Sequence, residues 1–375
     1  MFVGISNTPR PYAWGSKTAI AEQLGWVPYG GPEAELWLGA HPGSPSRIVD
    51  PPSVSGAPTL DQIVALPFLL KLLAAAAPLS LQAHPSISQA LAGFARENQQ
   101  GISVDAPHRN YRDTGHKPEL LYALSNQFRA LCGFAPASAT RERIGKMIEA
   151  HPAPTGLRSL QDRLISDSFI GPTFEWLISR GEGVDRLIDD VVDAATAVSG
   201  VEFDLVGELA LAHPGDPGIV ISLMLNFVSL RQGEALFLPA GNIHAYIEGF
   251  GIEVMSSSDN VLRGGLTAKH IDVPELLSIL NFAPLPVPYL FPQTEGIGVV
   301  AFRPPTQDFA LLLVEHAGVV ALTGPAVLLC VDGNFAVTGA MGSMQIARGA
   351  SSYVSADEAQ LRVAGNGRLF IATTG

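Results

Sequence analysis

The stretch from Gly233 to Arg263 constrains the fold more than any other part of the chain. It reads GEALFLPAGNIHAYIEGFGIEVMSSSDNVLR, in which apolar and β-prone residues surround a turn built on Pro239–Asn242. The turn delivers His244 onto the next predicted strand, and Tyr246, two residues on, shares its face because strand side chains alternate. Neutral imidazole is the commonest metal ligand among side chains, although a lone strand histidine is more often held by a hydrogen bond. His244 is therefore a candidate ligand that needs partners.

A second predicted strand carries three polar residues on one face. The apolar run 66–85 reads LPFLLKLLAAAAPLSLQAHP, and Pro78 divides it into two elements, of which the second is a short strand. On that strand Ser80, Gln82 and His84 alternate and share a face. Three polar side chains on one face of an apolar strand are costly unless they meet partners or a metal. This strand is therefore a candidate partner for His244.

Two charged residues lie where apolar neighbours make a charge costly. Glu119 follows Lys117 and a proline and opens the apolar run 120–124, so its carboxylate needs a cation at the entrance of a buried strand. A lone glutamate would more often lie on the surface, but beside the histidines it supplies the anion that a metal site needs. Lys71 lies inside an apolar run, so its ammonium either snorkels to the surface or is buried with a partner.

Two tryptophans are candidates for lining a sugar pocket. Trp14 lies at a Gly-rich turn, and Trp37 lies in the segment 34–42. A flat apolar ring at such a turn commonly covers the apolar face of a pyranose. The alternative is a plain core aromatic, which is equally favoured for Trp14 and is the favoured interpretation for Trp37.

Periodicity divides the chain into three units. From about residue 136 to residue 212, apolar residues recur every three or four positions opposite charged ones, which is typical of amphipathic helices. After a Pro-rich segment, short β-prone runs separated by Gly turns predict a second, smaller β-barrel. We expect a discontinuous β catalytic domain, a helical insertion and a C-terminal β domain, with the bounds 1–135 plus 219–285, 136–218 and 286–375. Short helices are also expected at 18–24 and 273–280, and a helix followed by a strand over 219–230.

Charge and composition exclude several classes of partner. The chain has 375 residues, enough for two or three domains, and 23 basic against 35 acidic residues give a net charge of −12. Such an acidic chain has no general attraction for nucleic acid or anionic membranes. The two isolated cysteines, Cys132 and Cys330, favour a reducing compartment, and the N-terminus lacks the pattern of a signal peptide. We therefore expect a cytoplasmic protein without a membrane span.

The spacing of Gly233, Pro239, Gly241 and His244 resembles the second motif of the cupin superfamily, in which that histidine binds a metal inside a small β-barrel. Glu248 stands where the superfamily pattern has Asn. Together, several motifs in chain order resemble the type I mannose-6-phosphate isomerases. These motifs are AELWLG with Glu35, PLSLQAHP with Ser80, Gln82 and His84, HKPE with His116 to Glu119, PAGNIHAY with His244 and Tyr246, and SDNVLRGGLTAKH with Asp259 and Arg263.

The resemblance implies a fold and a metal site. The fold is mainly β with an α-helical insertion, built from a cupin-type β-barrel (jelly roll) catalytic domain, the helical domain and the smaller C-terminal barrel. One Zn²⁺ per chain is held by Gln82, His84, Glu119 and His244. Two neutral imidazoles, an amide oxygen and one carboxylate leave the ion with net positive charge and room for oxygen ligands.

The resemblance also implies the reaction, the reversible conversion of mannose 6-phosphate into fructose 6-phosphate through an enediol. Arg263 is the catalytic position, and Lys117 and His116 are candidates for proton transfer. Lys71 and Ser80 are expected at the phosphate. The full set of expected substrate contacts is Trp14, Glu35, Lys71, Ser80, Tyr246, Glu253 and Asp259.

Some questions stay open at this level. Which residue is the general base does not follow from the sequence. Ala13 stands where some relatives carry Asp before the pocket Trp, which removes one sugar contact. One alternative is a differently acting metal cupin such as an Fe(II) oxygenase, and another is a non-catalytic cupin that binds a sugar phosphate. Lys117 and Arg263 argue against the latter. The expected partner is a small sugar phosphate, and we expect a monomer.

Overall fold

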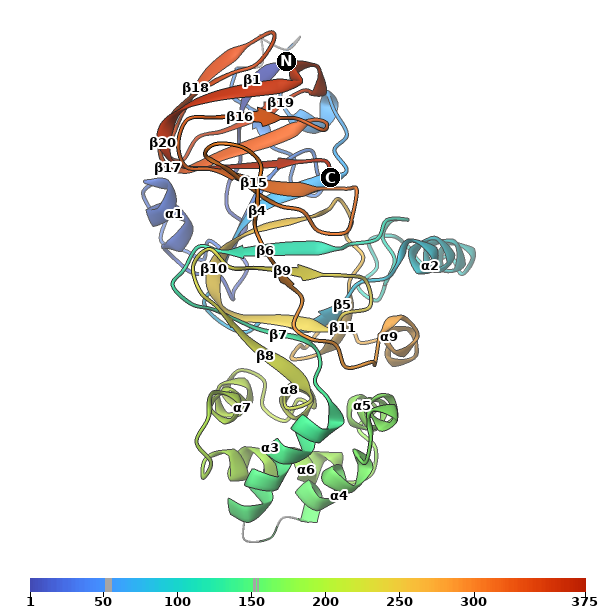
Figure 1. Cartoon of the computed structure of the whole chain (residues 1–375). Coiled ribbons are helices and arrows are strands. Elements are labelled where there is room, and N and C mark those ends of the chain that lie inside the picture. Colours follow the sequence, from blue (N-terminus) through green and yellow to red (C-terminus); the bar gives the residue numbers. More distant parts are fainter. Residues whose placement is uncertain (51–55, 151–152, 154) are drawn as a thin grey trace.

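The computed structural model describes residues 1–50, 56–150, 153 and 155–375. Within these residues the strands form two ten-stranded sheets, and a group of helices lies beyond the end of one of them (Figure 1). The chain is thus mainly β with helices, as the sequence predicts. The strand pairings follow open paths through the described residues, so the expected barrels remain predictions.

The central sheet is organised around one long strand, β10 (His244–Ser256). It pairs with β4 (Phe68–Ala75), β6 (Glu119–Ala123), β5 (Leu81–Ala83) and β7 (Phe128–Phe134). The sheet is completed by β2 (Glu35–Leu38), β8 (Leu225–Leu230), β9 (Ala235–Leu238), β11 (Leu262–Gly265) and β12 (Tyr289–Leu290). Because β10 pairs with four strands, segments that are far apart in sequence meet beside it.

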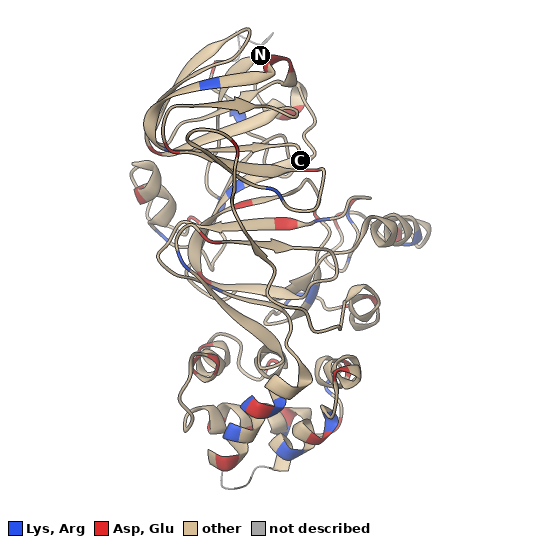
Figure 2. Ribbon diagram, viewed as in Figure 1, with Lys and Arg blue, Asp and Glu red and all other residues tan. Residues whose placement is uncertain are grey.

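The helical group follows β7 and returns the chain to β8. It comprises α3 (Ala137–Ala150), α4 (Thr155–Arg163), α5 (Ile170–Ile178), α6 (Val184–Ala195), α7 (Val201–Ala212) and α8 (Gly218–Ser222). Their apolar faces share one core, in which Leu157, Leu187 and Leu209 are fully buried. Charged residues gather on these helices and are sparse along the sheets (Figure 2). The predicted helical block over 136–212 is confirmed.

The C-terminal sheet is built on a long antiparallel pair, β17 (Ala326–Thr338) and β20 (Gln360–Thr373). It also holds β13 (Gln293–Thr294), β14 (Val299–Phe302), β15 (Ala310–Val314), β16 (Gly318–Ala321), β18 (Ser343–Ala347) and β19 (Ser351–Val354). The chain's first strand, β1 (Phe2–Ser6), pairs with β19 and with β3 (Arg47–Ile48). The N-terminal segment is therefore part of this sheet.

The two sheets share an apolar core. The ring of Tyr122 on β6 meets Phe302 and Phe370 of the C-terminal sheet edge-on, at centroid distances of 5.3 and 5.1 Å. Buried residues of β4 and β10 belong to the same cluster. The C-terminal sheet thus packs directly on the strands that carry the candidate site.

The short elements agree with the sequence, with one exception. The helices α1 (Ala19–Leu24) and α9 (Val273–Ile279) confirm the predicted short helices, and α8 followed by β8 confirms the predicted helix and strand. The helix α2 (Ile87–Gln99) was not predicted. Its signal is a capping box, because Ser86 and Gln89 each bond the other's backbone N–H. No helix of the described residues is long and apolar enough to cross a membrane.

Candidate active site

Strand register brings the predicted metal residues together. His244 opens β10 and lies opposite Gln82 of β5, while Glu119 opens β6 and lies opposite Met255 near the other end of β10. The turn before β10 is tied to His84, because the N–H of Gly241 donates to the His84 carbonyl at 2.8 Å. Gly241 has a φ of 76°, and a Cβ there would lie 2.9 Å from a backbone oxygen, so only glycine fits this turn.

The side chains of His84, Glu119 and His244 form a buried cluster. Their potential ligand atoms all lie within 4.8 Å of one another, and each residue is 1% exposed. The Nε2 atoms of His84 and His244 each lie 3.3 Å from a Glu119 carboxylate oxygen. Gln82 adjoins the cluster, with its amide nitrogen 3.3 Å from His244 Nε2.

Hydrogen bonds on the far side of each imidazole fix its tautomer. His84 Nδ1 lies 2.7 Å from the carbonyl of Asn260, and His244 Nδ1 lies 3.0 Å from that of Asn242. A carbonyl only accepts, so both Nδ1 atoms carry the proton and both Nε2 atoms present a lone pair to the carboxylate. His84 Nε2 and Glu119 Oε2 are buried without a hydrogen-bond partner among the residues that the structure describes. Converging lone pairs beside an anion fit a bound cation, and the nitrogen and oxygen donors suit zinc.

The charge state of the cluster suits metal binding at neutral pH. Burial lowers the pKa of His84 to about 4, with a further lowering by the Lys117 ammonium, so this imidazole is neutral. Burial opposes ionisation of Glu119, but Lys117, whose Nζ lies 2.9 Å from Oε1, and the two histidines outweigh it and hold the pKa of Glu119 well below its usual range. The cluster therefore offers a carboxylate at Glu119 and a neutral imidazole at His84.

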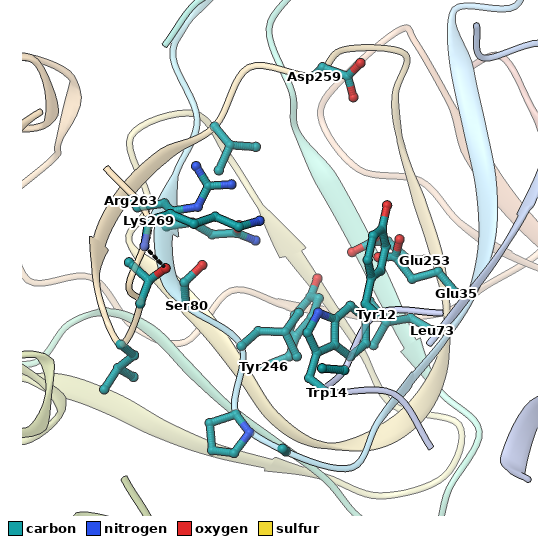
Figure 3. Close-up of a pocket in the computed structure, with 18 of the residues that line it drawn as sticks. Tyr12, Trp14, Glu35, Leu73, Ser80, Tyr246, Glu253, Asp259, Arg263 and Lys269 are labelled. Atoms are coloured by element: carbon teal, nitrogen blue, oxygen red, sulfur yellow. Dashed lines mark hydrogen bonds between the residues drawn. The ribbon is translucent and has the colours of Figure 1, made fainter. Parts of the chain in front are cut away.

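A cavity of about 730 Å³ opens beside this cluster. Gln82, Glu119 and Lys117 line its wall. Figure 3 shows Trp14, Tyr12 and Tyr246 on one side, with Glu35 and Glu253 behind them. Every predicted substrate contact lines this cavity: Trp14, Glu35, Lys71, Ser80, Tyr246, Glu253 and Asp259.

Lys71 is buried and paired rather than snorkelling to the surface. It is 5% exposed, and its Nζ lies 2.9 Å from Glu253 and 3.6 Å from Glu35. Burial lowers the pKa of Lys71, but the two carboxylates outweigh it and raise that pKa above its ordinary value. Trp37 closes this network, because its indole N–H donates to Glu35 at 2.8 Å and its ring lies 5.0 Å from the ammonium. The positive charge of Lys71 is therefore already matched by carboxylates.

The opposite end of the cavity is basic. Arg263 lies on β11 opposite Gln82 of β5, and Figure 3 shows Lys269 and Ser80 beside it. Burial lowers the pKa of Arg263, and the nearby cation Arg112 lowers it further. Lys269 shows the same pattern, with burial first and then Arg263 and Arg112 lowering its pKa. Cations that repel one another around a cavity favour an anionic ligand.

His116 was predicted beside the metal, and its ring lies elsewhere. Among the described residues that line the cavity, His116 is not found. Its Nε2 lies 2.6 Å from Asp308 Oδ2, in the C-terminal part of the chain. Residues that the sequence did not single out do line the cavity, namely Tyr12, Arg109, Arg112, His213, Thr267 and Lys269. Of these, Thr267 and Lys269 carried a signal, because both fall within a quoted motif.

Comparisons with known proteins agree along the whole chain. A family model described as phosphomannose isomerase type I, catalytic domain, matches residues 2–137. Mannose-6-phosphate isomerase of Escherichia coli (strain K12) is 36% identical over 384 residues, covering 97% of each chain. The Homo sapiens protein of that name is 31% identical over 383 residues, covering 88% of this chain and 87% of its own.

Solved structures extend the agreement to three dimensions. Mannose 6-phosphate isomerase from Salmonella typhimurium, bound to fructose 6-phosphate as substrate and to zinc, matches with a TM-score of 0.88 at 34% identity, covering 100% of this chain and 99% of that one. Another mannose 6-phosphate isomerase, bound with zinc and yttrium, matches with a TM-score of 0.87. On identity, coverage and fold together, this chain belongs to the type I phosphomannose isomerase family.

Proposed function

We propose that this protein is a zinc-dependent isomerase that interconverts mannose 6-phosphate and fructose 6-phosphate. The observation that carries the proposal is the buried His84, Glu119 and His244 cluster, whose lone pairs converge beside a cavity with a basic end. Relatives at 36% identity over nearly the full length are mannose-6-phosphate isomerases, and a neighbouring structure holds substrate and zinc. Cluster, cavity and relatives all support the same chemistry.

Three residues of the cluster would hold the zinc, with Gln82 as the fourth. The Gln82 amide now directs its nitrogen toward His244, so a half-turn of the amide would present its oxygen instead. Bound there, Zn²⁺ supplies Lewis-acid polarisation of the carbonyl and hydroxyl oxygens of the sugar.

We infer that the phosphate binds at the basic end rather than at Lys71. Lys71 is buried between two carboxylates, so its charge is neutralised before a ligand arrives. Arg263 and Lys269, with the Ser80 hydroxyl, lie at the other end of the cavity (Figure 3). The Lys269 ammonium and the Ser80 hydroxyl suit the phosphate oxygens, which leaves the Arg263 guanidinium, opposite Gln82 in the strand register, for the reacting carbons. The sugar then lies between this end and the aromatic side of Trp14 and Tyr246.

The isomerisation moves a proton from C2 to C1. A base removes the C2 proton while O1 gains one, which gives the enediol, and C1 is then protonated as O2 loses its proton. Lys117 lines the cavity and contacts Glu119 at 2.9 Å, so its ammonium can exchange protons or steady the developing charge at the reacting carbons. Arg263 lies on β11, which pairs with β5, and can stabilise the negative charge of the enediolate.

We infer that the chain forms three units, with the bounds 1–135 plus 219–285, 136–218 and 286–375. The first unit is interpreted as a cupin-type barrel and the third as a smaller relative of it. β1, which these bounds place in the first unit, pairs with β19 of the third. We further propose a monomer in the cytoplasm, which fits the two buried free thiols, Cys132 and Cys330.

An activity assay tests the proposal. Purified protein is supplied with mannose 6-phosphate, and fructose 6-phosphate is followed through a coupled reduction of a nicotinamide nucleotide. Turnover in both directions is expected, with none on unphosphorylated mannose at the same concentration. Binding of mannose 6-phosphate without turnover would leave the non-catalytic sugar-phosphate cupin as the correct interpretation.

A further inference from the structure

A carboxylate of the C-terminal unit, that of Asp308, contacts two residues next to the candidate active site. Asp308 lies in the segment between β14 and β15, and its Oδ2 lies 2.6 Å from His116 Nε2. The same oxygen accepts a hydrogen bond from the Ser256 hydroxyl. His116 and Asp308 have side chains that are 24% and 28% exposed, so both are largely withdrawn from solvent.

The two partners of Asp308 are the neighbours of residues that line the cavity. His116 immediately precedes Lys117, and Ser256 immediately follows Met255 at the end of β10. The two segments also bond each other, because the Ser256 N–H donates to the Pro118 carbonyl at 3.2 Å. We call the place where these two segments meet, residues 116–118 and the end of β10 at Ser256, the corner at Lys117. Asp308 therefore bonds both segments of this corner.

Asp308 is itself held on a well-anchored segment. Its N–H donates to the Thr306 hydroxyl at 3.3 Å, and the carbonyl of Gln307 accepts from the N–H of Gly375 at 3.1 Å. Phe309, the next residue, is fully buried in the core that the two sheets share. An anchor of this kind can transmit position, because its own place is set by packing.

The electrostatics agree with a charged acceptor. The hydrogen bond from His116 lowers the pKa of Asp308, and the Ser256 hydroxyl lowers it further against the opposing effect of burial. The carboxylate is therefore ionised at neutral pH and accepts from both partners, which gives charge-assisted bonds.

We propose that Asp308 is a positioning residue of the active site, which sets the place of Lys117 against Glu119 through His116 and Ser256. The inference rests on the proposed function, since it concerns the isomerisation step. It gives the C-terminal unit a part in catalysis, and it gives a role to the contact of His116, the neighbour of a cavity residue, with Asp308. A displacement of a catalytic group by about 1 Å can cost roughly a hundredfold in rate.

The alternative is an ordinary contact between two units, and the chain offers a matched control. Arg348 of the C-terminal sheet donates to the backbone carbonyls of Gln23, at 2.7 Å, and Glu22. This contact also joins the C-terminal sheet to a segment of the first unit, and none of the three residues lines the cavity in the described part of the chain. Arg348→Ala therefore removes a contact between units without touching the corner at Lys117.

The experiment compares Asp308→Ala, Asp308→Asn and Arg348→Ala with wild type in steady-state kinetics on mannose 6-phosphate. Asp308→Ala is expected to lower kcat by roughly tenfold or more and to change KM by less than about threefold, because the basic end is untouched. Asp308→Asn is expected to recover most of kcat, since an amide oxygen in place of Oδ2 accepts from both partners. Arg348→Ala is expected to keep kcat within about twofold of wild type.

A double-mutant cycle with His116→Ala completes the test. If Asp308 acts through His116, the double variant loses no more kcat than the worse single variant. His116→Ala also carries the prediction alone should Asp308→Ala fold poorly, which melting temperature and zinc content report. A kcat within twofold of wild type for a folded Asp308→Ala, an equal loss in Arg348→Ala, or additive losses would each overturn the inference. An inactive wild type would instead refute the proposed function, and the inference would fall with it.

Discussion

The two ends of the cavity are built in different ways. At the metal end, His84, Glu119 and His244 are each 1% exposed. Glu119 and His244 are placed by the pairing of β10 with β6 and β5, and His84 immediately follows β5. At the basic end, Arg263 is half-buried, and Lys269 and Arg112 are exposed and lie outside the strands. The metal end is closed to solvent and can impose a fixed geometry on an ion. The basic end is open and can admit and release an anionic substrate. A substitution at this closed metal end should therefore lower turnover more than a substitution at the open basic end.

The largest effect is expected from removing a histidine of the cluster. In His84→Ala and His244→Ala, zinc binding is lost and turnover falls by roughly a thousandfold or more, because the Lewis acid goes with its ligand. Inductively coupled plasma mass spectrometry gives the zinc content, and the coupled assay gives the rate. Stoichiometric zinc in both variants would show that the metal lies elsewhere.

A smaller loss is expected from Arg263, which belongs to the basic end but lies opposite Gln82 in the strand register. Arg263→Ala should lower turnover by about a hundredfold, since the guanidinium stabilises enediolate charge in a partly desolvated cavity. Arg263→Lys should recover little, because an ammonium lacks the planar fork. Zinc content and melting temperature should match wild type, because Arg263 is not a ligand. Turnover of Arg263→Ala within threefold of wild type would remove it from the catalytic residues.

The open end is tested by Lys269. Lys269→Ala should raise KM for mannose 6-phosphate by about tenfold with kcat nearly unchanged, since a lost phosphate contact weakens ground and transition states equally. The effect should shrink with added salt, because the ammonium is exposed. Lys17→Ala, which removes an exposed lysine that does not line the cavity, is the matched control. A fall in kcat with unchanged KM would place Lys269 in the chemistry instead.

The smallest effect concerns access to the closed end. Cys132 lies opposite His244 in the strand register, and burial raises the pKa of its thiol to about 12. Its thiolate is therefore scarce at pH 8, and the folded wild type should not react with a thiol reagent such as Ellman's reagent. Ser80→Cys, which adds a thiol to the cavity wall, should react, and the unfolded wild type should show both cysteines. Rapid labelling of folded wild type would mean that the closed end opens readily.

Strand periodicity placed the side chains, and the resemblance grouped them into one site. Gln82 lies on the short strand β5, His84 immediately follows it, and Glu119 and His244 open β6 and β10. The structure brings all four together, as the motifs of the resemblance imply. The helical insertion was equally accessible, because its 3.6-residue period extends over many turns.

The rest depended on contacts that no local pattern records. Lys71 was expected at the phosphate, and no local pattern shows that Glu253 and Glu35 approach it from β10 and β2. His116 faces Asp308, which is 192 positions away in sequence. Arg112 lines the cavity from an irregular loop. In such a loop neither the helical nor the strand period predicts which way a side chain points. Orientation across such distances is set by packing between units.

The central claim is that the buried cluster holds a zinc ion on which isomerisation depends. The most direct test is to measure metal content and turnover of the same preparation before chelation, after chelation and after zinc is restored. The account predicts about one zinc per chain, loss of turnover with the metal, and recovery on adding Zn²⁺, as expected for a site whose ligands are preformed. Full turnover on mannose 6-phosphate in metal-stripped protein would contradict it.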